Sequence, residues 1–238
     1  MRSIALVLGL IGMIVTSSAS ALPVVVQSIA SGIDDSTGEK IPYSNSDDSY
    51  VIGPGSTEGV GLVPYTVNTD LVYSDHFFPD SESAESRWIA IDISHPESPY
   101  DAQPHIVQTG TYSFLTSVNL SGFDPGSAQI ENVRFGADNQ LIGVLVNGSS
   151  VFSESASEPR AEDFKTFHTL GTLGAGLMQA GLNEIEFKVY NARVNSQILA
   201  NSMGFRVEGL LTANPIPEPT TALLLCIGLI GLGLNRRA

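Results

Sequence analysis

The sequence predicts an all-β protein whose exported part folds as an antiparallel β-sandwich. Apolar and polar residues alternate with a period of two in several segments between Trp88 and Leu211, as in strands with one covered face. Asn147-Gly148 lies between two β-rich arms, which is typical of a type I′ hairpin. No segment between the two ends has a convincing helical period, and the nearest, Leu173–Leu182, is interrupted by three glycines.

Residues 1–21 have the pattern of a secretory signal peptide. Arg2 precedes the apolar stretch Ile4–Val15, and Ala19-Ser20-Ala21 forms a small-residue cleavage site. We expect a helix here that signal peptidase removes after Ala21. A permanent membrane anchor is the alternative, but the apolar stretch is short and no positively charged stop follows it.

The sequence of residues 22–87 predicts that the N-terminal part of the exported domain is rich in loops. Ser31–Gly61 is polar and rich in Gly, Ser and Asp, so we expect loops with at most one or two short strands. Four tyrosines could line a shallow site: Tyr43, Tyr50, Tyr65 and Tyr73. Acidic groups supply the hard oxygen ligands of calcium: Asp34-Asp35, Asp47-Asp48 and Asp75–Asp80. None forms an EF-hand, so a structural calcium ion is a hypothesis.

Residues 88–212 are expected to form the sandwich core, beginning with a strand at its N-terminal end. Ile89 and Ile91 would face the core, which puts Trp88 on the opposite face with Asp92. A ring beside a carboxylate can stack on a sugar and hydrogen bond its hydroxyls, so Trp88 and Asp92 are candidate sugar-binding residues. We favour the alternative that Trp88 packs under the N-terminal loop, because large aromatic side chains are usually buried.

Further strands follow in order. Thr111–Leu120 and Asn183–Tyr190 alternate regularly, and Met203–Leu211 does so with Arg206 and Glu208 on the face opposite its apolar residues. Leu141–Phe152 contains the hairpin, and Phe164–Leu170 is another candidate strand.

Residues 213–238 form a three-part tail. Pro217-Glu218-Pro219 is followed by an apolar run and then by Arg236-Arg237. The thirteen apolar residues Ala222–Leu234 would span only roughly 20 Å as a helix, less than the ~30 Å hydrocarbon core of a bilayer. We therefore expect a short, weak membrane helix, whose arginines keep the tip cytoplasmic.

This tail resembles the PEP-CTERM sorting signal of Gram-negative bacteria. The resemblance implies recognition by an exosortase, a membrane protease that cleaves near Pro217-Glu218-Pro219, after transient membrane insertion through the C-terminal helix. The product would then be displayed at the cell surface or secreted. Such proteins commonly accompany exopolysaccharide production, so the resemblance also implies an extracellular polysaccharide as a partner.

The body resembles a galactose-binding-domain-like jelly roll. The segments that carry the resemblance are T-G-T-Y-S-F-L-T-S-V-N-L-S-G-F-D-P-G, A-D-N-Q-L, V-L-V-N-G, A-G-L-N-E-I-E-F-K-V-Y-N and M-G-F-R-V-E-G. The resemblance implies a sandwich that in other proteins serves sugar binding, protein binding or packing. Jelly rolls of this kind often carry a structural calcium ion.

The composition restricts the function further. The chain has 25 acidic and 11 basic residues and a net charge of −14, which disfavours binding to nucleic acid. The single cysteine, Cys226, lies in the tail, so the exported domain has no disulfide. The four histidines, His76, His95, His105 and His168, have no zinc-site spacing, and no nucleophile motif occurs.

We therefore expect an exported, non-enzymatic protein of the cell surface or extracellular matrix that binds carbohydrate. One alternative is a protein–protein adhesion module, which would expose a large apolar patch. Another is a glycan-active hydrolase, which would bring two acids together in one cleft.

Overall fold

The computed structural model describes residues 22–67, 85–91, 106–156, 164–192 and 200–216. These ranges contain strands and turns, and no helix is present in them. Within them, nothing helical is long and apolar enough to cross a membrane. The two predicted terminal helices lie outside the described ranges. The described part is thus all-β, as the period-two patterns predict.

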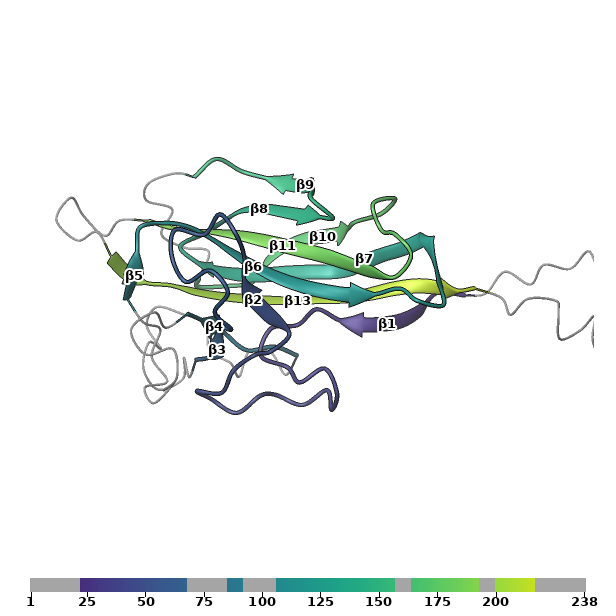
Figure 1. Cartoon of the computed structure of the whole chain (residues 1–238), viewed down its shortest axis with the longest axis horizontal. Helices are drawn as coiled ribbons and strands as arrows, with labels where there is room; N and C mark the ends of the chain where they lie inside the picture. The colour runs from purple at the N-terminus through teal and green to yellow at the C-terminus, as the bar shows by residue number, and fades with distance from the viewer. Residues whose placement is uncertain (1–21, 68–84, 92–105, 157–163, 193–199, 217–238) are drawn as a thin grey trace, which may run out of the picture.

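Thirteen strands are described (Figure 1). They are β1 Val24–Ser28, β2 Tyr50–Ile52, β3 Tyr65–Thr66, β4 Ile89–Ala90, β5 Ile106–Gln108, β6 Gly110–Asn119, β7 Phe123–Asp138, β8 Gln140–Val146, β9 Ser149–Ser153, β10 His168–Leu173, β11 Leu182–Asn191, β12 Ala200–Ser202 and β13 Gly204–Pro215.

The strands form two large sheets and one small one. The six-stranded sheet has the order β10-β7-β13-β4-β3, with β1 also paired to β13. The five-stranded sheet has the order β2-β6-β11-β8-β9, and β5 pairs with β12. Every pair is antiparallel. Both large sheets include strands from the segment before Trp88, because β1, β2 and β3 belong to them.

The hydrophobic core lies between the two large sheets. The predicted inner faces of β6 and β11 are confirmed, since Tyr112, Phe114, Ile185, Phe187 and Val189 are fully buried. The sheets meet at aromatic side chains: the ring of Phe205 on β13 lies 5.0 Å from that of Phe114 and 5.1 Å from that of Phe187, centroid to centroid. Such tilted pairs add to the free energy of burial, so these rings help to fix how the sheets stack.

The predicted hairpin is confirmed. Asn147 and Gly148 connect β8 to β9 with φ values of 50° and 76°, the left-handed pair that a type I′ turn requires. The candidate strand Phe164–Leu170 is confirmed only in its second half, because β10 begins at His168.

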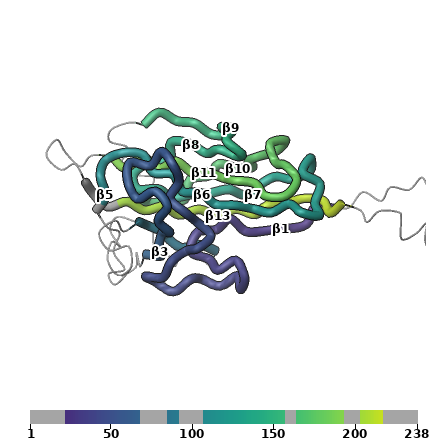
Figure 2. Tube along the Cα trace, in the orientation of Figure 1, coloured from purple at the N-terminus to yellow at the C-terminus, as the bar shows by residue number. Residues whose placement is uncertain are grey.

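The N-terminal loops cover the outer face of the six-stranded sheet. As predicted, Ser31–Gly61 holds one short strand, β2, and is otherwise turns and loops. These loops are nevertheless anchored, since the Ser31 N–H donates to the Val207 carbonyl at 3.0 Å and the Tyr50 hydroxyl donates to the Ile29 carbonyl at 2.5 Å. In Figure 2 the purple part of this segment lies beside β1 and β13, while its blue part continues along the edge of the sandwich to β2, which pairs with β6. The outer face of β13 is therefore covered.

Candidate functional site

A buried polar cluster lies on the covered outer face of β13. Sequence analysis placed Arg206 and Glu208 opposite the core, and the structure agrees, but it also buries both side chains (0% and 2% exposed). Glu208 Oε1 accepts the Ser86 hydroxyl at 2.6 Å, and Glu208 Oε2 accepts Arg134 Nε of β7 at 2.5 Å. Arg206 in turn donates to the Ser86 hydroxyl and carbonyl oxygens at 2.7 and 3.0 Å. Ser86 thus links the buried Arg206 guanidinium to the buried Glu208 carboxylate, and the partly exposed Arg134 supplies the opposite charge for Glu208.

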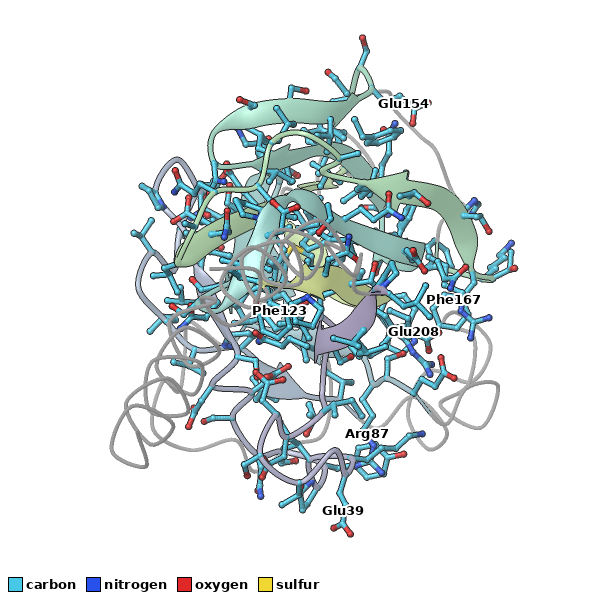
Figure 3. The ribbon with its side chains drawn as sticks, turned by 90° about the vertical axis from the view of Figure 1, so that its right-hand side faces the viewer. Glu39, Arg87, Phe123, Glu154, Phe167 and Glu208 are labelled. Carbon is cyan, nitrogen blue, oxygen red and sulfur yellow. The ribbon has the colours of Figure 1, made fainter. Side chains whose placement is uncertain are left out.

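Phe167 lies against both arginines of this cluster. Its ring centroid is 4.5 Å from the Arg134 guanidinium carbon and 5.0 Å from that of Arg206. Figure 3 shows Phe167 and Glu208 on the same side of the molecule. These cation–π contacts hold the two guanidinium planes in place.

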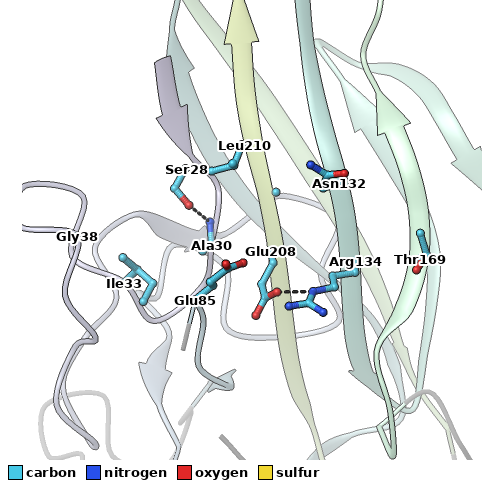
Figure 4. Close-up of a pocket in the computed structure, with 11 residues that line it drawn as sticks. Ser28, Ala30, Ile33, Gly38, Glu85, Asn132, Arg134, Thr169, Glu208 and Leu210 are labelled. Carbon is cyan, nitrogen blue, oxygen red and sulfur yellow. Dashed lines mark hydrogen bonds and ion pairs between the residues drawn. The ribbon is translucent and has the colours of Figure 1, made fainter. Parts of the chain in front are cut away.

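The cluster opens into a groove of about 700 Å³, within the usual size range of ligand sites. Figure 4 shows Arg134 reaching across to Glu208, with Glu85 beside them and Asn132 and Thr169 farther along the sheet. The lining residues are Ser28, Ala30, Ile33, Gly38, Glu85, Asn132, Arg134, Thr169, Glu208, Gly209 and Leu210. They come from β1, β7, β10 and β13 and from the N-terminal loops, so the groove exists only in the folded chain.

Irregular pairing shapes the floor of the groove. The β7–β13 ladder shifts register between Glu208 and Leu210, and the β7–β10 ladder shifts between Thr169 and Gly171. At the same level Asn132 has a φ of 56°, so an extra residue is accommodated in β7. The bulge shifts the alternation by one residue, so that Ile130 and Val133 both face the core and Asn132 and Arg134, two residues apart, share the outer face.

Gly209 lets the N-terminal segment approach β13 closely at this point. A Cβ atom at Gly209 would lie 3.1 Å from Cδ1 of Ile29 and 3.2 Å from Cγ2 of Ile130. Ile29 continues from β1 and its N–H donates to the Gly209 carbonyl at 3.0 Å. The missing side chain therefore allows one wall of the groove to form.

The groove combines hydrogen-bond donors and acceptors with apolar walls. Glu85 and Glu208 offer acceptors, Arg134 offers donors, and Asn132 and Thr169 offer both. Ala30, Ile33 and Leu210 add apolar surface. Because Arg134 is already paired with Glu208, the groove presents no uncompensated positive charge of its own. Such a surface suits a neutral ligand with many hydroxyl groups.

Trp88 is packed, as the favoured prediction has it, and the alternative of an exposed ring that stacks on a sugar is wrong. It is 1% exposed and packs in a small apolar cluster with Tyr65, Val67, Ala90 and Phe164. The strand β4 is covered on both faces, because Ile89 and Ile91 belong to the main core and Phe164 and Phe167 pack against the face that holds Trp88. The favoured alternative of a packed Trp88 agrees with this burial. Its partner Asp92 lies outside the described residues.

The tyrosines do not line a shallow site either. Tyr50 and Tyr65 are buried, at 1% and 4% exposure, and the Arg87 guanidinium carbon lies 4.0 Å from the ring centroid of Tyr43. Tyr73 lies outside the described residues. Each described tyrosine therefore has a packing partner in place of an open ring face.

The acidic side chains of the N-terminal loops accept hydrogen bonds from nearby backbone N–H groups. Asp47 is buried and accepts the Gly32 N–H at 2.6 Å and the Ser49 N–H at 3.1 Å, while burial raises the pKa of Asp47 to about 6. Asp34 accepts the Ser36 hydroxyl and N–H, which together lower the pKa of that carboxyl. In the described ranges no three histidine, cysteine or acidic side chains come together as metal ligands would. Asp75–Asp80 lies outside those ranges, so calcium stays a prediction.

The terminal signals also fall outside the described residues. These are Ala19 and Ala21 of the predicted leader and Pro217, Glu218, Pro219, Arg236 and Arg237 of the tail. For the tail, comparison with protein families gives a direct result: residues 215–237 match the PEP-CTERM protein-sorting motif. The chain carries this sorting motif. This motif indicates an exosortase-sorted protein that is exported to the cell surface or the extracellular space.

The match covers the tail and does not extend into the sandwich. No curated protein and no solved structure is significantly similar to the chain. The sorting motif thus indicates the export route of the protein, and the groove is the feature of the sandwich that points to a ligand.

Proposed function

We propose that this exosortase-sorted protein is a non-enzymatic carbohydrate-binding module of the cell surface or extracellular matrix. In this proposal the groove between β1, β7, β10 and β13 binds a neutral sugar of an extracellular polysaccharide. The observation that carries it is the fixed Arg134–Glu208 pair in a groove that also contains Asn132 and Thr169. The resemblance of the body to galactose-binding-domain-like jelly rolls supports the same reading.

Sugar hydroxyls match the chemistry of the groove. Each hydroxyl donates one hydrogen bond and accepts others, so it can bridge a carboxylate such as Glu85 and an amide such as Asn132. The C–H faces of a sugar ring need apolar contact, which Ile33 and Leu210 provide. A ring bound here would be partly exposed, as suits a residue within a long polymer chain.

The hydrogen bonding of Glu208 supports binding over hydrolysis. A glycosidase needs one carboxyl group as a proton donor and a second as a nucleophile or base. Both oxygens of Glu208 already accept hydrogen bonds, one from Ser86 and one from Arg134, which fix the orientation of the carboxyl group. Its oxygens are therefore engaged within the protein and are poorly placed to act on a glycosidic bond, although Glu208 can still help to orient a ligand through Arg134.

The proposal is tested with the processed protein purified from the producing culture. It is applied to a glycan array and to the polysaccharide of the producer, with and without calcium. Asn132→Gly removes the amide but keeps the left-handed backbone, and Thr169→Val removes the hydroxyl but keeps the shape. Ser149→Ala on the exposed β9 serves as the matched control.

Each groove variant should weaken glycan binding roughly three- to tenfold, the value of one hydrogen bond, and Ser149→Ala should leave it unchanged. Binding should vary little with salt, because the ligand is neutral. If the wild-type protein binds no glycan under any of these conditions, the proposal is wrong.

A further inference from the structure

The chain enters and leaves the sandwich at one end, which we call the exit pole. It consists of residues 22–25, 120–123, 147–148, 174–182 and 214–216. Val24 pairs with Ala213, and the Ile216 N–H donates to the Gly122 carbonyl at 2.9 Å. In Figure 1 the start of β1 and the end of β13 lie side by side at the right-hand end of the molecule.

Two turns complete the exit pole. The turn before β11 is fixed to the end of β6, since the Leu120 N–H donates to the Gly181 carbonyl at 2.8 Å. It is also fixed to the β8–β9 hairpin, because Asn147 Nδ2 donates to the Leu177 carbonyl at 3.0 Å. Figure 3 views the molecule from this end, with Phe123 near the centre. The pole is thus formed by several segments that are hydrogen bonded to one another.

Exposed apolar side chains gather at the exit pole. Of the ten large apolar residues exposed in the described ranges, six lie there. They are Leu22, Val24, Val25, Leu177, Leu182 and Ile216. Leu182 is 65% exposed although it begins a strand whose next apolar residue, Ile185, is fully buried. Exposed apolar residues that cluster in this way mark an interaction surface.

The exit pole is also free of charged residues. Its 22 positions include no Asp, Glu, Lys, Arg or His, in a chain that has 25 acidic residues. Asp124, Glu184 and Glu218 are the charged residues that follow its segments most closely in the sequence. The net negative charge of the chain repels an anionic lipid surface, but this end can approach one at the least electrostatic cost.

The sorting tail places this end near a membrane. Five residues, 217–221, separate Ile216 from the apolar run that begins at Ala222. Fully extended, they reach at most about 18 Å. While the apolar run is in the bilayer, the exit pole is therefore held close to the lipid headgroups.

We propose that the exit pole docks on the bilayer surface while the sorting tail is inserted, with its exposed leucines and valines in the headgroup layer. This inference rests on the proposed sorting through a membrane-inserted tail. Docking orients the sandwich and keeps Pro217-Glu218-Pro219 at the membrane surface, where a membrane protease acts. Once the tail is cut, the few apolar side chains alone hold the sandwich only weakly.

The test uses the full chain with Cys226→Ala, reconstituted in vesicles of phosphatidylethanolamine and phosphatidylglycerol. A nitroxide label is attached at Leu182→Cys or, as a matched control, at Val60→Cys. Val60 is similarly exposed, at 57%, and lies in the loop between β2 and β3, outside the exit pole. Collision of each label with oxygen and with a water-soluble nickel chelate is then measured by electron paramagnetic resonance.

Docking predicts that the label at position 182 is shielded from the nickel chelate and meets more oxygen, while the label at position 60 behaves as in water. Flotation of the vesicles separately reports insertion of the tail. Protein that does not float contradicts the proposed membrane route. If the protein floats and the nickel chelate reaches both labels equally, docking alone is overturned. Docking is also overturned if the spectrum at position 182 shows spin–spin broadening that dilution with unlabelled protein removes, because a second copy would then cover the pole.

Discussion

Arg134 Nε on β7 donates to Glu208 Oε2 on β13 at 2.5 Å, although the two side chains differ greatly in exposure. The Arg134 side chain is 41% exposed and that of Glu208 is 3% exposed. The pair thus joins a solvent-facing groove to a buried cluster. Removing Glu208 leaves the buried Ser86 hydroxyl without its acceptor, whereas the space that Arg134 vacates is open to water, which can take over its hydrogen bond to Glu208.

Glu208→Ala should therefore lower the free energy of unfolding by about 3 kcal/mol. Arg134→Ala should lower it by only ~1 kcal/mol, because solvent partly replaces the guanidinium. Urea denaturation of each variant measures the difference, with the exposed Glu39→Ala as control, for which a change within roughly 0.5 kcal/mol is expected. Equal losses for Glu208→Ala and Glu39→Ala would show that the cluster contributes no stability.

Asp47 should make stability increase as the pH falls. Its pKa is about 6 in the folded protein against 3.8 for an ordinary aspartate, so the folded state binds a proton more tightly than the unfolded chain. Above pH 6 folding has to bury the charged form, and this cost disappears as the pH falls toward 4. Between pH 7.5 and 4.5 the free energy of unfolding should rise by roughly 2 kcal/mol more in the wild type than in Asp47→Asn.

Urea denaturation at the two pH values gives this difference. All other titrating groups are present in both proteins, so their contribution drops out when the wild type is compared with Asp47→Asn. Asp47→Ala should in addition lose ~2 kcal/mol at both pH values, because the Gly32 N–H is left without its acceptor. An identical pH response in wild type and Asp47→Asn would mean that Asp47 does not titrate in this range.

The two glycines Gly148 and Gly143 should respond differently to alanine. Gly148 has a φ of 76° with no atom near a new Cβ, so Gly148→Ala should cost about 1 kcal/mol through backbone strain alone. Gly143 on β8 has ordinary contacts of 3.6 Å or more around its Cβ position. Gly143→Ala should therefore be close to neutral. Thermal unfolding distinguishes the two, and similar melting temperatures would contradict the turn assignment.

The sorting tail predicts a processing defect. Glu218→Gln, or deletion of Arg236 and Arg237, should leave uncleaved protein in the membrane fraction, because the motif at 215–237 is then incomplete. Immunoblots of membrane and culture fractions measure this, and Glu39→Gln in the sandwich is the control. Mass spectrometry that finds an intact C-terminus on the mature surface protein would contradict exosortase processing.

Strands with an unbroken period of two were predictable from the sequence. Tyr112, Phe114 and Val118 in β6 alternate without interruption, and so do the inner residues of β11. β7 was not predicted, because its buried residues run Ile130, Val133 and Phe135, and the spacing of three breaks the pattern. That break is the trace of the bulge at Asn132, so it was the one local signal that pointed toward the groove.

The groove itself was not predictable from local patterns. A period of two assigns Arg206 and Glu208 to an outer face, and outer faces are assumed to meet solvent. Here loops from far along the chain cover that face: Ser86, which bonds Glu208, is 122 residues away in sequence. Trp88 was correctly predicted to lie opposite Ile89 and Ile91 and to be packed, but Phe164, which helps to bury it, comes from far along the chain. Long-range packing decides such cases, and alternation within one strand does not report it.

The strand that leads into the sorting motif is held on both sides. β13 pairs with β7 from Gly204 to Pro215 and with β1 and β4 on its other edge. If the protein remains tethered through its tail, any drag from fluid or polymer pulls along the axis of β13. Ladder hydrogen bonds perpendicular to that pull have to slide together and do not peel one by one. The attachment point thus resists mechanical shear.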